Sequence, residues 1–164
     1  MANQERFEEA IAQIQEGLAA QRVAGAENGR PQNLNLLADA CMKTDRLDDG
    51  LSVLTEALAA AEENENRHYE AETHRLKGEL LLKQHGSNLK EAKSCFERAI
   101  EIARGQSARS WELRATLSLA RLLAKQGKRD EGRAMLAGIY SWFTEGFDTA
   151  DLKEAKALLE QLNS

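Results

Sequence analysis

The sequence has 164 residues, of which 42% are hydrophobic and 30% are charged, so it is long enough for one soluble domain with a buried core. A single proline, few aromatic residues and many good helix formers favour an all-α fold throughout the chain. The net charge of −5 and the pI of about 5.3 argue against binding to nucleic acid or to an anionic membrane.

Hydrophobic periodicity and the turn residues between the periodic segments predict eight helices. In chain order they span residues 3–22, 31–44, 47–62, 68–84, 89–104, 110–126, 129–142 and 149–162. Pro31 suits the first turn of the second helix, where a missing N–H costs no hydrogen bond. Gly127 suits a helix exit, and the Asp148 carboxylate can accept hydrogen bonds from the free N–H groups that open the last helix.

A small residue followed four and seven positions later by packing residues recurs along the chain. A weak first copy and three clear copies are Ala10-Ile14-Gly17, Gly50-Leu54-Ala57, Ala92-Phe96-Ala99 and Gly132-Leu136-Ile139. Successive copies begin 40, 42 and 40 residues apart, which is the signature of a repeat protein. Before each of the last three copies a second helix carries its own small residue, which is Ala38, Gly78 or Ala120. Each repeat is therefore a helix, a tight turn and a helix.

Residues four and seven apart share one face of a helix, and Gly or Ala there lets two helices approach closely. One hairpin cannot bury its apolar face alone, so neighbouring hairpins must stack. We predict a right-handed α-solenoid of antiparallel helical hairpins with one concave and one convex face. A single domain, 1–164, would divide into a partial repeat at 1–24, repeats at 31–63, 68–105 and 110–143, and a capping helix at 149–163.

The small-residue pattern and the period of the hairpins resemble the tetratricopeptide repeat (TPR). Four segments further resemble the C-terminal TPR region of bacterial predicted signalling ATPases, which often carry an adenylate or guanylate cyclase domain. They are ETHRLKGELLLKQ after Ala71, EAKSCFERAIEIAR from Glu91, SWELRATLSLARLL from Ser110, and YSWFTEGFDTADLKEAKALLEQL from Tyr140. The resemblance implies a TPR-like fold and a role in protein–protein interaction.

The same resemblance implies that this chain is the non-catalytic C-terminal part of a larger signalling ATPase or cyclase. No Walker-type glycine loop and no cyclase metal-carboxylate pattern occurs in the sequence, so the chemistry of such a protein would lie elsewhere. The pattern of the first helix marks it as the second helix of a hairpin. We therefore expect the chain to be a fragment truncated before residue 1.

The concave surface of such a solenoid is lined by outward positions of each hairpin's first helix. By register, the candidate partner-binding residues are Gln32, Asn35, Asp39, Met42, Glu72, Arg75, Glu79, Arg114, Leu117 and Arg121. This polar mixture suits a protein or peptide segment that carries spaced charges. The alternative is that these side chains are simply solvated.

We expect no metal, no cofactor and no catalytic site. His68, His74 and His85 are six and eleven residues apart, unlike the spacing of three or four that places two ligands on one helix face. No nucleophile, base and orienting group occur at a readable spacing, so the chain is predicted not to be an enzyme. Cys41 and Cys95 are predicted to be free thiols, which fits a cytoplasmic location.

Both ends of the solenoid carry apolar side chains. A cluster predicted to fill the joint beneath the last helix consists of Tyr140, Trp142, Phe143 and Phe147. A stripe predicted to be exposed on the first helix consists of Phe7, Ile11, Ile14 and Leu18. Because solenoid ends need a polar cap, this stripe predicts either self-association, with a homodimer through the first helix as one form, or contact with the upstream domain of the parent protein.

Two functions remain open from the sequence. The first is an interaction and regulatory scaffold that binds a protein or peptide segment and acts on upstream catalytic domains. The second is a purely structural or oligomerisation arm without a specific ligand. Neither involves nucleic acid or a membrane, and the acidic last helix lacks the basic face that membrane insertion requires.

Overall fold

The computed structural model describes residues 2–26, 28–63, 65, 67–84 and 88–164, and within these residues it contains eight helices and no strand. The helices are α1 (Ala2–Ala24), α2 (Arg30–Lys43), α3 (Leu47–Glu63), α4 (Glu70–Lys83), α5 (Leu89–Gly105), α6 (Arg109–Lys125), α7 (Arg129–Tyr140) and α8 (Ala150–Asn163). Every predicted helix is confirmed, with each end within two residues of its predicted position.

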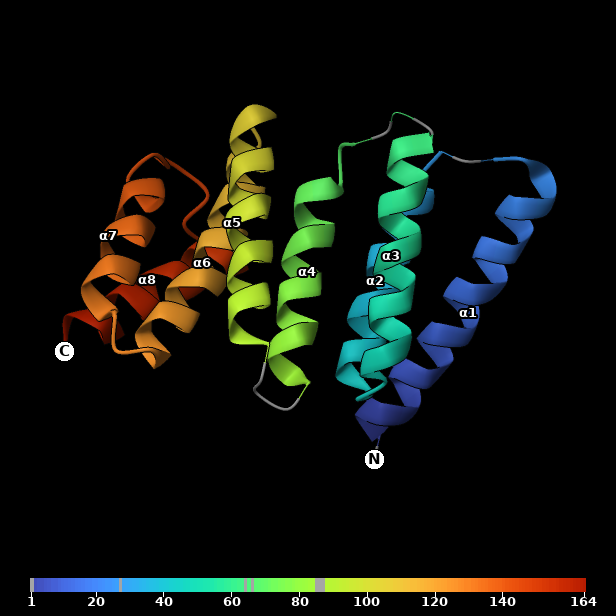
Figure 1. Ribbon diagram of the computed structural model, residues 1–164, viewed down its shortest axis with the longest axis horizontal. Helices are drawn as coiled ribbons and strands as arrows, with labels where there is room; N and C mark the ends of the chain where they lie inside the picture. Colours follow the sequence, from blue (N-terminus) through green and yellow to red (C-terminus); the bar gives the residue numbers. More distant parts are fainter. Residues whose placement is uncertain (1, 27, 64, 66, 85–87) are drawn as a thin grey trace.

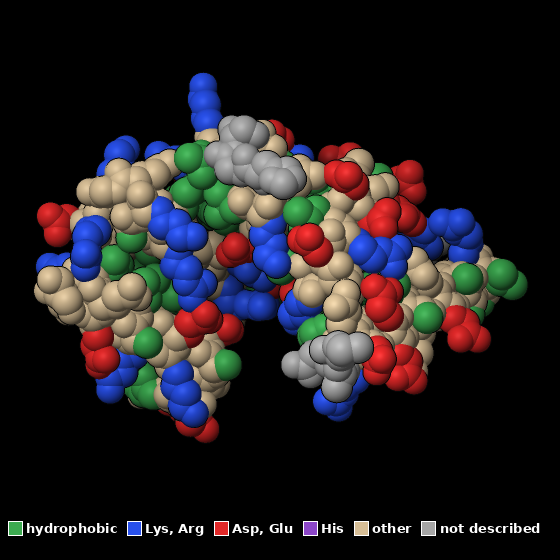
Figure 2. All heavy atoms as spheres, turned by 90° about the horizontal axis from the view of Figure 1, so that it is seen from below, with side chains coloured by type: hydrophobic (Ala, Val, Ile, Leu, Met, Phe, Trp, Pro, Cys, Tyr) green, Lys and Arg blue, Asp and Glu red, His purple; other side chains and the backbone are tan. Residues whose placement is uncertain are grey.

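The helices form three antiparallel hairpins, α2–α3, α4–α5 and α6–α7, which stack in chain order between α1 and α8 (Figure 1). The inner helices α2, α4, α6 and α8 each contact the next one along the stack. Figure 2 shows that this inner side is hollowed between the two ends, with Lys and Arg side chains gathered at the base of the hollow. The predicted solenoid with a concave face is confirmed.

Turn residues account for several helix ends. Pro31 lies in the first turn of α2, two residues after the N-cap Gly29, whose φ of 81° favours glycine. Gly127 follows α6 with a φ of 80°, as expected for a helix exit. The prediction for Asp148 was wrong, because the N-cap of α8 is the extended residue Thr149, which makes no side-chain capping bond.

Close approach at small residues holds the stack together. A Cβ atom on Gly132 would lie 3.0 Å from the carbonyl oxygen of Ala120, so α7 packs directly against the backbone of α6. A Cβ on Gly78 would lie 2.5 Å from the ring of Phe96, which is fully buried between α4, α5 and α6. The core therefore runs along the whole stack, and the inner helices have fixed positions from which to present side chains to the hollow.

Candidate functional site

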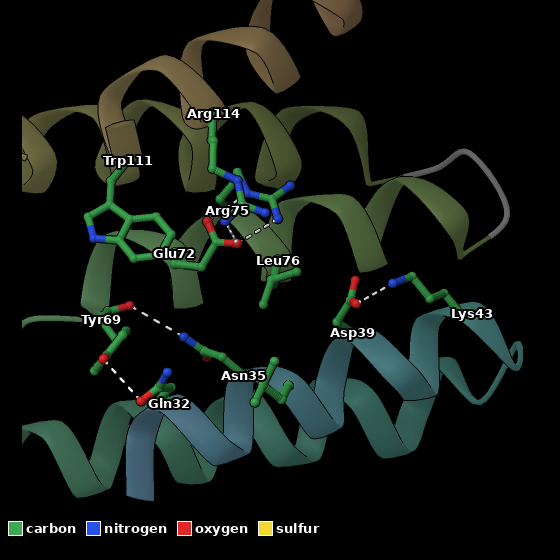
Figure 3. Close-up of a pocket in the computed structure, with 11 residues that line it drawn as sticks. Gln32, Asn35, Asp39, Lys43, Tyr69, Glu72, Arg75, Leu76, Trp111 and Arg114 are labelled. Carbon is green, nitrogen blue, oxygen red and sulfur yellow. Dashed lines mark hydrogen bonds and ion pairs between the residues drawn. The ribbon is translucent and has the colours of Figure 1, made fainter. Parts of the chain in front are cut away.

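A cavity of about 270 Å³ lies on the concave face, with side chains from three successive inner helices (Figure 3). Helix α2 and helix α6 face each other across it, and α4 with the residue before it lies between them. The lining residues are Gln32, Asn35, Leu36, Asp39, Lys43, Tyr69, Glu72, Arg75, Leu76, Trp111 and Arg114. We call this cavity the central groove.

A buried carboxylate between two arginines forms one wall of the central groove. Arg75 donates from Nε and Nη2 to the two oxygens of Glu72, at 2.8 Å each, and Arg114 Nη1 lies 2.9 Å from Glu72 Oε1. Burial alone would lower the pKa of Arg75, but the hydrogen bonds and negative charge of Glu72 outweigh it and leave that pKa raised. Arg75 therefore keeps its charge, and the side chains of this wall hold one another in place through charge-assisted hydrogen bonds.

Aromatic side chains close one end of the central groove. The rings of Tyr69 and Trp111 meet edge to face with centroids 6.3 Å apart, and the Arg114 guanidinium lies 5.4 Å from the Trp111 ring. The Tyr69 hydroxyl donates to Gln32 Oε1 at 3.1 Å, and the Asn35 amide donates to the Tyr69 carbonyl at 3.5 Å. These bonds tie α2 to the start of α4.

The opposite end of the groove is open and partly apolar. Lys43 Nζ donates to Asp39 at 2.6 Å, so the two charges at this end neutralise each other. Leu76 is buried, whereas Leu36 is 52% exposed although it lines the cavity. An exposed leucine among paired polar groups leaves apolar surface that a bound segment could cover.

Six of the ten predicted partner-binding residues line the central groove, namely Gln32, Asn35, Asp39, Glu72, Arg75 and Arg114. Met42, Glu79 and Arg121 lie outside its lining; Glu79 accepts from the Ser118 hydroxyl at 2.5 Å, and Arg121 pairs with Glu154. Leu117 was wrongly predicted to face the groove. It is 2% exposed and packs in the core beside α8, because α8 covers the side of α6 that the repeat register left open.

Five lining residues were not predicted from the sequence: Leu36, Lys43, Tyr69, Leu76 and Trp111. Tyr69 precedes its helix, so helical register could not place it, and Trp111 was identified only as part of the sixth helix. Leu36 lies between Asn35, which was predicted to line the groove, and the buried Leu37. Helical periodicity assigns a face only approximately, so it did not show on which side of α2 this leucine lies.

The prediction of an exposed stripe on α1 was wrong for its central residue. Ile11 is only 2% exposed and packs with Leu37 and Cys41, and Ile14 and Leu18 lie against the same cluster. Helix α1 therefore turns this stripe toward the apolar side chains of α2 and toward Val53 of α3. Phe7, Ile14 and Leu18 are only partly buried, and self-association through α1 stays a prediction.

The aromatic cluster before α8 is only partly in the core. Tyr140 and Phe143 pack against the core cluster of α6 and α8, but Trp142 is 56% exposed and Phe147 is 45% exposed. Trp142 and Phe143 line a second cavity of about 470 Å³, where α6 and α8 begin. The joint beneath α8 was predicted to be filled by four aromatic side chains, but only Tyr140 and Phe143 pack there. The second cavity stays open beside them, and we call it the terminal cavity.

Two of the three histidines, His68 and His74, lie in the described part of the chain. His74 is partly buried, and desolvation together with the positive charges of Arg98 and Lys77 lowers its pKa to about 4. The His68 ring packs edge to face on Tyr69, and His85 lies outside the described residues. Within residues 2–26, 28–63, 65, 67–84 and 88–164, no group of three His, Cys, Asp or Glu side chains has a metal-binding arrangement.

Comparison with known proteins agrees with this geometry. Residues 29–105 match the tetratricopeptide repeat family. These residues span α2 to α5, so they include the two hairpins that form most of the central groove. TPR segments generally mediate protein–protein interaction. No curated protein matches the sequence.

Solved structures show the same fold over nearly the whole chain. Two crystal structures of the nearly identical TPR-like repeats of a protein assigned as a kinesin light chain of Podosopora anserina, one of them a variant, are similar to this chain. Both are 18% identical to it, with TM-scores of 0.66 and 0.64. The match covers 98% of this chain and 87% or 88% of theirs, so the TPR-like solenoid extends beyond residues 29–105. In the described part of the chain, every helix is too short or too polar to span a bilayer.

Proposed function

We propose that the central groove binds a segment of another protein and that this chain is a non-catalytic interaction module. The observation that carries the proposal is the groove itself, in which three successive inner helices present aromatic, apolar and polar side chains to one cavity. Peptide-binding sites of this kind derive affinity from apolar surface and specificity from placed polar groups.

The central groove is held in shape before any segment binds. Glu72 is paired with two arginines, Asp39 with Lys43, and Tyr69 with Gln32. A segment would therefore pay little to order these side chains. Because the charges neutralise one another, the exposed Leu36 and the ring of Trp111 are the natural contacts for an apolar side chain.

The wider context of the module is part of the proposal. The four segments quoted above support a place as the C-terminal, non-catalytic part of a larger signalling ATPase or cyclase. The two free, buried cysteines, Cys41 and Cys95, support a cytoplasmic location. The alternative is a purely structural arm, in which stacking alone sets the spacing or the oligomeric state.

Selection from a peptide display library, followed by calorimetry with the enriched peptides, tests the proposal. Leu36→Arg should weaken an enriched peptide by tenfold or more, because it places a charge where apolar contact is expected. Leu36 suits this test better than Arg114, whose charge reversal would leave a buried carboxylate facing a new acid. Leu89→Arg is the matched control, since Leu89 is 40% exposed at the start of α5 and lies outside the groove.

An equal loss of peptide affinity in both variants, or no loss in either, would contradict peptide binding in the central groove. A library that yields no enriched peptide would favour the structural arm. Sedimentation equilibrium of the same protein then tests that alternative, because an oligomerisation arm should form dimers at micromolar concentration.

A further inference from the structure

The terminal cavity adjoins the central groove along α6. Ser110 lines the terminal cavity, and the next residue, Trp111, lines the central groove. The side chain of Arg114, in the groove, lies 3.7 Å from Asp151, which lines the terminal cavity. The cavity has an apolar floor, where Leu113 is buried, and an aromatic wall of Trp142 and Phe143. A segment bound in the groove can therefore continue into it.

The two cavities differ in charge. The central groove is lined by three basic side chains and by the two carboxylates of Asp39 and Glu72, so its lining is nearly balanced in charge, whereas the terminal cavity is lined by Glu145 and Asp151 and, within the described residues, by no Lys or Arg. Glu145 makes no ion pair in the described part of the chain. Among the described residues, the one ion-pair partner of Asp151 is Arg114 at 3.7 Å, and Arg114 is bound more closely to Glu72 at 2.9 Å.

Helix dipoles oppose this negative charge but do not cancel it. Both α6 and α8 begin at the cavity, and each helix N-terminus carries about half a positive charge. Together they offset roughly one of the two carboxylates. The Thr149 hydroxyl, which makes no capping bond in α8, adds an uncommitted acceptor at the same edge.

The aromatic wall already accommodates a cation. The Arg109 guanidinium lies 5.4 Å from the centroid of the Trp142 ring, and Arg109 Nη1 donates to Glu112 at 2.7 Å. An indole face attracts cations through its quadrupole, and its flat apolar surface also covers an alkyl chain. Carboxylates beside exposed aromatic surface match a long side chain with a charged tip.

We propose that the terminal cavity binds a lysine or arginine side chain of the segment in the central groove. The alkyl stem lies along Trp142 and Phe143, and the cation lies between Glu145 and Asp151. This inference rests on the proposed function in one respect, namely that the basic side chain belongs to a segment bound in the central groove. It gives the bound segment a direction, with its basic residue at the α8 end.

The two tryptophans report on the two cavities separately, since the chain contains only Trp111 and Trp142. The indole N–H signals of the 15N-labelled protein are followed during titration with three capped amino acids at millimolar concentration. The probes are the N-acetyl methylamides of lysine, norleucine and glutamate. The lysine probe should shift the Trp142 signal at about one fifth of the norleucine concentration or less, and 0.5 M NaCl should reduce that difference.

Glu145→Gln removes the charge at an exposed position and keeps the shape of the side chain, so it should weaken the lysine probe about fivefold. Glu160→Gln is the matched control on α8, because Glu160 is exposed and outside the cavity. Equal response to lysine and norleucine, an unchanged titration in Glu145→Gln, or no shift of Trp142 with any probe would each overturn the inference. The proposed function is judged separately, by peptide binding and by the Trp111 signal.

Discussion

The first helix and the middle of the stack carry the same repeat pattern but pack differently. Gly17 of α1 is exposed, and a Cβ placed on it would meet no neighbour within 4 Å. Ala57 and Ala99, which hold the same position in the next two repeats, are at most 1% exposed. Small residues therefore mark where a helix can approach, but they contribute packing energy only where a neighbouring helix is present.

The largest difference between the two regions should come from removing a buried leucine. Leu80→Ala in α4 empties a site with 0% exposure and should lower the free energy of unfolding by about 3 kcal/mol. Leu18→Ala in α1 removes a half-buried side chain and should cost about 1 kcal/mol. Urea unfolding measures both, and equal losses would show that α1 is packed as tightly as the middle.

Glycine-to-alanine changes should have opposite signs in the two regions. Gly78→Ala places a Cβ 2.5 Å from the buried Phe96 ring and should destabilise the protein by about 2 kcal/mol. Gly17→Ala meets no neighbour and should stabilise it by about 0.5 to 1 kcal/mol, because alanine favours the helix. Thermal unfolding of the two variants against wild type checks this, and a destabilised Gly17→Ala would mean that α1 has a close neighbour in solution.

Within the packed middle, replacing a buried threonine by valine should change the free energy of unfolding in opposite directions, depending on whether the threonine hydroxyl has a hydrogen-bond partner. Thr116 is buried in α6, and its Oγ1 has no hydrogen-bond partner in the described structure, so Thr116→Val should stabilise by about 1 kcal/mol. Thr73 donates to Asn35 Oδ1 at 2.9 Å, so Thr73→Val should destabilise by about 1 kcal/mol. Denaturant titration of both variants distinguishes the two cases, and a destabilised Thr116→Val would reveal a partner for that hydroxyl.

The smallest effect concerns pH. The pKa of His74 falls from its ordinary 6.5 to about 4 on folding, through burial and the charges of Arg98 and Lys77. Folding therefore favours the neutral ring, so its stabilising contribution is complete above pH 6.5 and is lost as the pH falls toward 4. Because the ring is partly exposed, the loss should be on the order of 1 kcal/mol. His74→Gln should remove this part of the pH dependence, and an unchanged pH profile of unfolding in that variant would contradict it.

The sequence predicted the fold well and the site only in part. Eight helices, their ends and the solenoid followed from periodicity, because a repeated apolar pattern has few ways to be buried. Helical register placed Glu72, Arg75 and Arg114 in the groove correctly. It failed for Tyr69, which is not in a helix, and for Leu117, because the position of α8 over α6 depends on how the whole end of the stack closes.

Local chemistry by itself determined that these residues form helices, where the helices end and which faces are small or apolar. Only the tertiary structure decided which apolar faces found a partner. The stripe of α1 turned inward onto α2, while Phe147 remained exposed and Trp142 remained exposed at the terminal cavity. The physical reason is that burial depends on contacts between segments distant in the chain, and a periodic pattern specifies a face without specifying what lies against it.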